Sequence, residues 1–324
     1  MIKRCEEFYT KLYSTRQCIQ PQNTTNAHIK ENRSPPIMPS EVRAAIKQLK
    51  RDKAPGEDNI TADILQDGGE PIIKVLTKLF NGCLISGKVP SCWKNAVMII
   101  IHKKSDTADI RNYQPISLLP VIYKVFSKVL LQRMLQTLDQ HQPREQEKAN
   151  EYKIPLCFAF IDYEKAFDSI EFTPMFTALE NQRVEPAYTT IQSDLYNGTT
   201  ATLRLHKDSN KIKLERGARQ GDSISPKLFT ACLQNAIINR IEWDGKGINI
   251  DGEHLLHLIS ADDIILMGQT SQEIQDMLTD FFNTSKEAGL NIHLGKTKVM
   301  QNNYVNKAAV TIDRKIIDEV DSYS

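Results

Sequence analysis

The sequence has few of the features that mark a secreted, membrane-bound or zinc-binding protein. Its six cysteines are scattered and form no C-x-x-C pair, which argues against a zinc knuckle or a disulfide framework and favours a reducing compartment. Charged side chains within residues 1–12 exclude an apolar signal core, and the longest apolar run, 96–101, is too short to span a membrane. We therefore expect a soluble intracellular protein, nuclear or cytoplasmic, with no membrane partner.

The sequence also lacks an excess of charge of either sign. Its 41 Lys and Arg and 40 Asp and Glu give a formal net charge of +1, so bulk charge cannot drive strong nonspecific binding of nucleic acid. Any such binding must rest on local basic clusters, although each cluster alone is more often a solvated face. The candidates are Lys47, Lys50, Arg51 and Lys53, then Lys103 and Lys104, then Lys211, Lys213, Arg216 and Arg219.

The first half of the chain has mostly helical patterns. Its 324 residues, with 40% hydrophobic and 25% charged side chains, have an ordinary globular balance. Residues 1–39 are predicted to be a flexible lead-in, because 15–39 are polar and rich in turn-forming residues. Four helices are predicted: one begins at a Ser40 cap, one after Asp58 or Thr61, one near Pro71, and one after Pro120. The third helix is predicted to end at Gly87, and a buried strand at 96–101 lies between it and the fourth.

The pattern changes after residue 155. We predict a strand at 156–161, helices at 173–182 and 186–196, and a hairpin of 199–206 with 211–215. A helix at 225–243, strands at 254–260 and 264–267, and a long helix at 271–289 follow. This order suits an α+β fold with a split β-α-β antiparallel sheet and helices packed on one face.

Two of the predicted strands end in acidic residues. One runs into Asp162, and the other carries the adjacent pair Asp262 and Asp263 between apolar residues. Such neighbouring carboxylates repel each other and lose hydration unless a cation lies beside them. Two divalent ions held by shared carboxylates suit an in-line phosphoryl displacement, and Mg²⁺ needs only a few carboxylates besides water and phosphates. The alternative is a surface hairpin whose turn merely contains two aspartates.

Several segments resemble the motifs of reverse transcriptases, in the same order. Each is weak alone, but the series over about residues 40–300 is highly specific. The sequence is therefore identified as similar to the reverse transcriptase domain of non-LTR (LINE-like) retrotransposons. The segments are 160–168, 217–226, 261–263 and 289–297, and upstream 53–58 and 101–104 with 112–119, which resemble the entry motifs of the non-LTR group.

The resemblance implies a right-hand polymerase. Residues 40–150 would form a fingers-like region and 151–305 the palm with the catalytic motifs, followed by a truncated tail at 306–324. The implied reaction is RNA-directed DNA synthesis by two-metal nucleotidyl transfer onto a primer 3′-hydroxyl. The implied partners are an RNA template, a DNA primer and deoxynucleoside triphosphates, and the implied cofactor is a pair of Mg²⁺ ions, for which Mn²⁺ could substitute.

The catalytic roles follow from the same resemblance, position by position. Asp162, Asp262 and Asp263 match the metal-binding aspartates. Lys296 matches a lysine suggested to donate a proton to the pyrophosphate.

The nucleotide-binding roles also follow from it. Phe167 matches the residue under the sugar, where a bulky ring would clash with a ribose 2′-hydroxyl; it could also be a core aromatic, and both roles could hold together. Gln220 and Gly221 match the pair at the incoming nucleotide, with the glycine allowing close backbone approach. Lys103 and Lys104 match fingers lysines near the triphosphate.

The sequence also departs from the family pattern. Gln114 stands where an arginine is expected, and glutamine cannot reproduce that charged, planar contact to phosphate. Ser260 replaces an aromatic residue before the Asp pair, and His293 stands where asparagine is usual. Residues 142–146 run directly into 147–152 where the family has a further segment and helix, which indicates an internal deletion. We also expect the chain to lack the amino-terminal endonuclease common in this group and to leave little room for a thumb.

These departures keep two alternatives open. The chain could be a non-catalytic relic of such a domain, at most a nucleic-acid-binding protein. An RNA-dependent RNA polymerase would use similar aspartates, but Phe167 and the segment 219–221 argue against that class.

Overall fold

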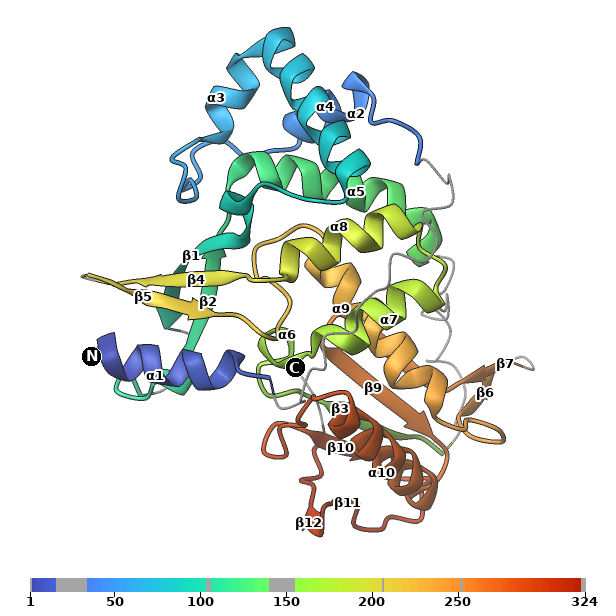
Figure 1. Ribbon diagram of the computed structural model, residues 1–324. Coiled ribbons are helices and arrows are strands. Elements are labelled where there is room, and N and C mark those ends of the chain that lie inside the picture. Colours follow the sequence, from blue (N-terminus) through green and yellow to red (C-terminus); the bar gives the residue numbers. More distant parts are fainter. Residues whose placement is uncertain are drawn as a thin grey trace.

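The computed structural model describes residues 2–15, 34–102, 106–139, 155–205, 207–250 and 253–321. These residues form helices packed around two separate four-stranded sheets, which confirms the α+β class (Figure 1). No helix within the described ranges combines the length and the apolar character needed to cross a membrane.

Four helices of the first half form one end of the molecule. The structure differs from the sequence prediction at the first of them, which begins two residues early with Met38 as its cap instead of Ser40. The Glu41 carboxylate accepts a hydrogen bond from the Met38 N–H at 2.8 Å, which closes this terminus. Thr61 caps the second helix and Gly87 ends the third in a left-handed conformation, both as predicted. The four are α2 (Pro39–Lys47), α3 (Ala62–Asp67), α4 (Gly69–Ser86) and α5 (Val121–Asp139).

The first sheet, sheet A, joins strands from both halves of the chain. Its order is β2-β1-β4-β5, with β1 and β4 parallel and the other neighbours antiparallel. The predicted hairpin after residue 199 thus extends the sheet of the predicted fingers-like region, and the core around α4 and α5 also includes side chains of α7 and α8. The strands are β1 (Asn95–His102), β2 (Tyr113–Leu118), β4 (Thr200–Arg204) and β5 (Asp208–Lys213), with short turns η1 (Ser91–Lys94) and η2 (Ile110–Asn112).

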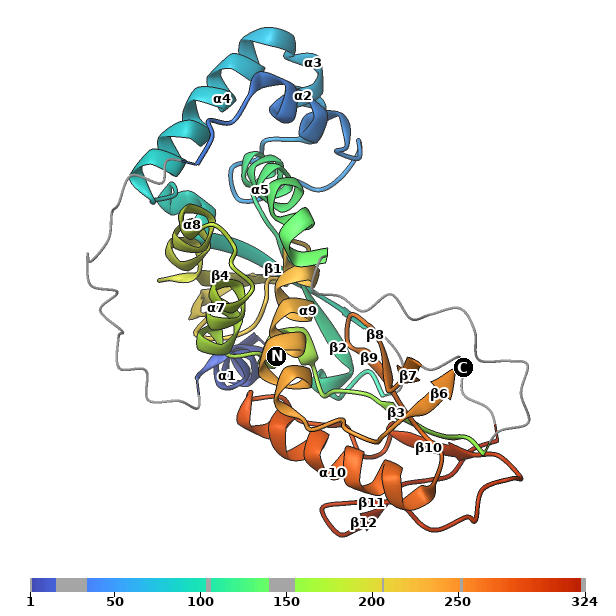
Figure 2. The same cartoon turned by 90° about the vertical axis from the view of Figure 1, so that its right-hand side faces the viewer.

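The second sheet, sheet B, has the order β10-β3-β9-β8 with all neighbours antiparallel. Helices lie between β3 and β8 and again between β9 and β10, which gives a β-α-β-β-α-β connection. Ala159, Leu266 and Val299 share one buried cluster with side chains of α9 and α10, which lie on the same side of the sheet (Figure 2). The strands are β3 (Cys157–Ile161), β8 (His257–Ser260), β9 (Asp263–Gly268) and β10 (Lys298–Gln301).

The remaining helices connect or cover the two sheets. The helix predicted over 225–243 ends earlier, because the chain turns at η3 and so buries Ile237, Ile238 and Ile241, while the Trp243 indole donates to the Ile238 carbonyl at 2.8 Å. The elements are α6 (Ala166–Ser169), α7 (Phe172–Asn181), α8 (Pro186–Tyr196), α9 (Ser225–Ala236), η3 (Ile238–Arg240), the hairpin of β6 (Ile248–Ile250) with β7 (Glu253–Leu255), and α10 (Ser271–Glu287).

The two predicted tails contain ordered structure. Within the predicted lead-in, residues 2–13 form helix α1 (Ile2–Tyr13), whose Cys5, Tyr9 and Tyr13 are buried in the core beside β5 (Figure 1). Their spacing of four residues places them on one helix face. At the other end, β11 (Thr311–Ile312) and β12 (Lys315–Ile316) pair, and Val310 and Ile317 are buried against the core of sheet B.

Candidate active site

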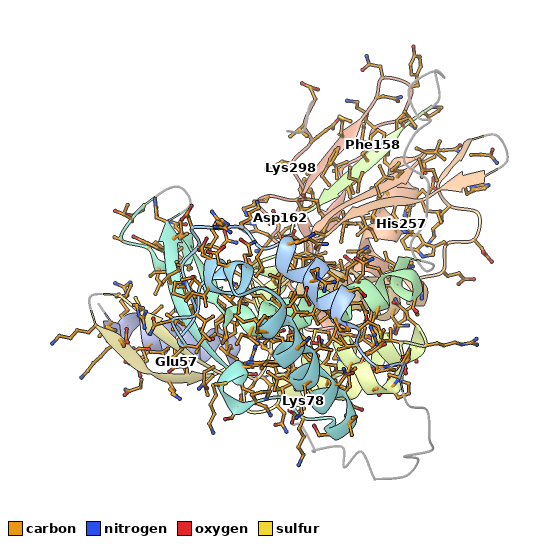
Figure 3. All side chains as sticks on the ribbon, turned by 90° about the horizontal axis from the view of Figure 1, so that it is seen from above. Glu57, Lys78, Phe158, Asp162, His257 and Lys298 are labelled. Atoms are coloured by element: carbon orange, nitrogen blue, oxygen red, sulfur yellow. The ribbon has the colours of Figure 1, made fainter. Side chains whose placement is uncertain are left out.

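The three candidate acids lie at one end of sheet B. Ile161 at the end of β3 pairs with Ile264 of β9, so Asp162 and Asp263 leave adjacent strands at the same edge. Asp262 belongs to the tight turn between β8 and β9. Figure 3 shows Asp162 at the end of the sheet nearer the rest of the molecule, with Phe158 further out along the same strand.

These acids are more accessible than their apolar neighbours suggested. Asp162 is half-buried, whereas Asp262 and Asp263 are exposed. The desolvation cost expected from the sequence is therefore small for the adjacent pair, because both carboxylates keep contact with water. Their mutual repulsion is the stronger reason to expect a cation at this edge.

The segment before β10 folds around Asp162. The His293 N–H donates to the Asp162 carbonyl at 2.7 Å, and the Asp162 N–H donates to the Thr297 hydroxyl at 3.4 Å. This turn places Lys296 Nζ 3.3 Å from Asp162 Oδ1, in an ion pair whose lysine side chain is 61% exposed. The structure thus brings together two of the candidate catalytic residues. The His293 backbone, rather than its side chain, makes the contact.

Phe167 lies on the turn that follows β3. The segment at 217–218 braces this turn: the Ala218 N–H donates to the Phe167 carbonyl at 2.6 Å, and the Gly217 N–H donates to the Ile170 carbonyl at 2.7 Å. The Phe167 ring stacks on Phe229 of α9, with ring centroids 4.6 Å apart, and stays partly exposed. Phe167 therefore packs on the core and also presents part of its surface to solvent.

Gln220 and Gly221 attach the site to sheet A. The Ser117 N–H donates to the Gln220 carbonyl at 3.1 Å, and Gln114 Nε2 donates to Gln220 Oε1 at 2.8 Å. Gly221 has φ +102°, and a Cβ at this position would lie 2.9 Å from the Ser117 carbonyl oxygen. The close backbone approach at this glycine is therefore to strand β2.

Two of the candidate nucleotide-binding residues, Lys103 and Lys104, lie outside the described residues. The junction at which the sequence indicates a deletion, 142–152, also lies outside them.

The basic cluster predicted at residues 211–219 is only partly exposed, because its two arginines are buried. Arg219 is 3% exposed and donates to the carbonyls of Trp93 and Lys94 at 2.9 and 3.2 Å. Arg216 is 4% exposed and lies beside the Glu171 carboxylate, with Nη1 and Oε1 3.8 Å apart. Both guanidinium groups make contacts inside the protein and are too buried to contact a nucleic acid. The lysines of this cluster, at 211 and 213, are exposed on β5.

Two buried carboxylates beside the site were not singled out from the sequence. Asp168 accepts a hydrogen bond from the Tyr13 hydroxyl at 2.8 Å, and Asp222 accepts from the hydroxyls of Tyr123 and Ser127. Burial, and next the charge of Asp222, raise the pKa of Tyr123 well above its ordinary value, so this phenol stays a donor. The donors lie about a hundred residues or more away in sequence, so no local pattern could reveal them.

The donor chemistry at the sheet edge fits a divalent ion. Carboxylate oxygens are the ligands that Mg²⁺ prefers, and the strand register brings three acids to one rim. Across the described ranges, however, no three His, Cys, Asp or Glu side chains are already grouped closely enough to hold a metal. The ammonium group of Lys296 supplies the positive charge beside Asp162 instead.

Comparison with known proteins identifies the family of the chain. A family described as "Reverse transcriptase (RNA-dependent DNA polymerase)" matches residues 101–311. The chain is 23% identical over 286 residues to the "Retrovirus-related Pol polyprotein from type-1 retrotransposable element R2" of Popillia japonica, covering 81% of this chain and 39% of the relative. It is 30% identical over 217 residues to the "RNA-directed DNA polymerase from mobile element jockey" of Drosophila melanogaster, covering 59% and 23%, and 25% identical over 328 residues to its Drosophila funebris counterpart, covering 89% and 34%.

This chain thus spans well under half the length of these relatives. The family match covers more than half of the chain, and the relatives are polymerases of LINE-like mobile elements. The chain belongs to the reverse transcriptase family, as a domain of the non-LTR, LINE-like kind.

Proposed function

We propose that this chain carries an RNA-directed DNA polymerase site that extends a primer 3′-hydroxyl with deoxynucleotides along an RNA template. The observation that carries the proposal is the common edge of sheet B, where Asp162 and Asp263 leave paired strands and Asp262 lies in the adjoining turn. The acids are accessible there, as a site that receives a primer end and a triphosphate requires.

The three aspartates would hold two Mg²⁺ ions, or Mn²⁺ in their place. When bound, such ions neutralise the attacking and leaving oxygens of an in-line displacement. Lys296 would donate a proton to the departing pyrophosphate. Its ion pair with Asp162 is largely exposed, and exposed pairs contribute only about 0–1 kcal/mol, so the lysine can leave the carboxylate at little cost.

The remaining candidates would recognise the nucleotide. Phe167 would form the floor under the sugar, since its ring is braced by α9 and yet partly exposed. Gln220 and Gly221 would lie at the incoming nucleotide, and Lys103 and Lys104 would lie near its triphosphate.

The non-catalytic alternative rests on Gln114. Its side-chain amide donates to the side chain of Gln220 at 2.8 Å, in the place where the family pattern has an arginine for phosphate. A charge-assisted phosphate contact contributes roughly 1.5–3 kcal/mol, so its loss could lower the rate by roughly one to two decades. If a helix is also missing near Glu147, Gln114→Arg and Ser260→Phe should recover little activity.

Primer extension tests the proposal. Purified protein would be given a homopolymer RNA template, a DNA primer, the matching deoxynucleotide and Mg²⁺. Because Gln114 stands in place of the arginine, we expect only slow extension by the unmodified chain, and its loss in Asp162→Asn and Asp262→Asn. Asp318→Asn is the matched control, because Asp318 also pairs with a lysine, Lys298 at 2.6 Å, but is not among the acids proposed to hold metal.

Two results would count against a polymerase. A folded, unmodified chain that binds the primer–template but does not extend it would support the relic. Extension that survives Asp262→Asn would show that the acids are not the catalytic centre.

A further inference from the structure

We propose that helix α1 positions the turn that carries Phe167 and thereby sets how strongly the site excludes ribonucleotides. This inference rests on the polymerase site proposed above. It concerns a helix in the part of the chain that the sequence predicts to be a lead-in, more than 150 residues before the turn.

The side chains of α1 hold both flanks of Phe167. On one side, the Tyr13 hydroxyl donates to Asp168 Oδ1 at 2.8 Å, and Asp168 is 2% exposed. On the other side, Lys165 Nζ lies 5.5 Å from the centre of the Phe8 ring and also donates to the Tyr113 carbonyl at 3.1 Å. Phe167 thus lies within a four-residue stretch that is fixed at both ends.

The carboxyl end of α1 also holds the segment that braces the turn. Arg216 Nε donates to the Leu12 carbonyl at 2.7 Å, and the Glu215 N–H donates to the Tyr13 carbonyl at 3.0 Å. The next residue, Gly217, donates its N–H to the Ile170 carbonyl on the far side of the turn. The same end of one helix therefore contacts both segments on which the Phe167 backbone depends.

The Tyr13 hydrogen bond is the most specific of these contacts. Burial, and next the charge of Asp168, raise the pKa of Tyr13, so the phenol remains a donor at neutral pH. A buried carboxylate that loses one of its donors is less well compensated and tends to draw in water or move, since burial of charge is costly. Because Asp168 is the immediate neighbour of Phe167, such a movement shifts the ring that would oppose a 2′-hydroxyl.

The chain contains a matched control one helical turn away. Tyr9 is fully buried in the same face of α1, and its hydroxyl has no hydrogen-bond partner among the described residues. Tyr9→Phe and Tyr13→Phe therefore remove the same atom from the same helix, and only the second removes a hydrogen bond to Asp168.

Two measurements on the full chain test the inference. Amide hydrogen exchange should accelerate about tenfold over residues 163–170 in Tyr13→Phe. In primer extension, the ratio of kcat/KM for dTTP to that for UTP should fall roughly three- to tenfold in the same variant. Tyr9→Phe should change neither quantity by more than about twofold.

The outcomes separate positioning from simple stability. Equal losses of kcat/KM for dTTP and UTP, or unchanged exchange over 163–170, would overturn the inference. If Tyr13→Phe does not fold, Asp168→Asn weakens the same hydrogen bond and should shift both quantities in the same direction. An unmodified chain without polymerase activity would remove the selectivity role together with the proposed function, and the exchange rates would still show whether α1 holds the turn.

Discussion

Gly221→Ala should destabilise the protein by separating the site from sheet A. The backbone at Gly221 has φ +102°, where an L-residue costs about 1–2 kcal/mol. The added Cβ would also lie 2.9 Å from the Ser117 carbonyl oxygen, a main-chain atom of β2 that cannot rotate away, and such overpacking costs about 1–3 kcal/mol. We expect the free energy of unfolding to fall by about 2–5 kcal/mol.

Gly245 provides the control for this substitution. It has φ +73°, and a Cβ there would meet no atom within 4 Å, so Gly245→Ala carries the backbone cost alone. Urea unfolding of both variants, followed by circular dichroism, gives the two free energies. Gly221→Ala should be the less stable variant by about 1–3 kcal/mol. Equal losses in the two variants would refute the close contact between Gly221 and Ser117 as the cause.

Three further substitutions test other contacts. Burial raises the pKa of the Cys157 thiol from 9.0 to about 11, so the unfolded chain loses this proton first as the pH rises. The free energy of unfolding should therefore fall between pH 9 and pH 11, and urea titrations should show a smaller fall in Cys157→Ala. An identical pH profile in the two proteins would contradict the assignment. Lys296→Met should tighten Mn²⁺ binding about two- to fivefold, because it removes a competing cation from Asp162. Electron paramagnetic resonance of free Mn²⁺ measures this affinity, and an unchanged affinity would argue against a metal at Asp162. Arg219→Ala should lower the free energy of unfolding in urea by about 3–5 kcal/mol, because it leaves buried carbonyls without donors. A large loss of RNA affinity at unchanged stability would show instead that the arginine binds nucleic acid.

The sequence predicted those elements whose pattern is local. The apolar run at 96–101 and the apolar helical face after Pro120 correspond to the observed β1 and α5. Helix α1 has the same kind of stripe in Cys5, Tyr9 and Tyr13, but a helix of 12 residues is marginal in water and depends on what it packs against. Its partners lie 155 residues or more away, so the sequence alone did not predict it.

The long-range pairings limited the prediction of the site in the same way. The apolar strands before Asp162 and after Asp263 indicated that these acids end neighbouring strands, and the register of β3 and β9 places them at one edge. Their binding of metal stays a prediction. The parallel pairing of β1 with β4, between Asn95 and Thr200, joins strands about a hundred residues apart and has no local signature. The burial of Arg219 was not predicted either, because arginine is mostly exposed and is rarely buried without partners.

Gln114 shows that the integrity of this fold and its capacity for catalysis depend on different properties of the same residues. Its hydrogen bond to Gln220, with the adjacent bond from Ser117, holds β2 against the segment at 217–221 without any charge. Packing therefore tolerates the loss of the family's arginine, because a neutral amide satisfies its neighbour as a guanidinium would. Triphosphate binding of the kind proposed above should be weakened by it, because a neutral amide offers no positive charge to offset the charge on the phosphates. A chain of this family can thus retain its core and lose affinity for its substrate, so nucleotide affinity, rather than stability, is the property that separates an active polymerase from a relic.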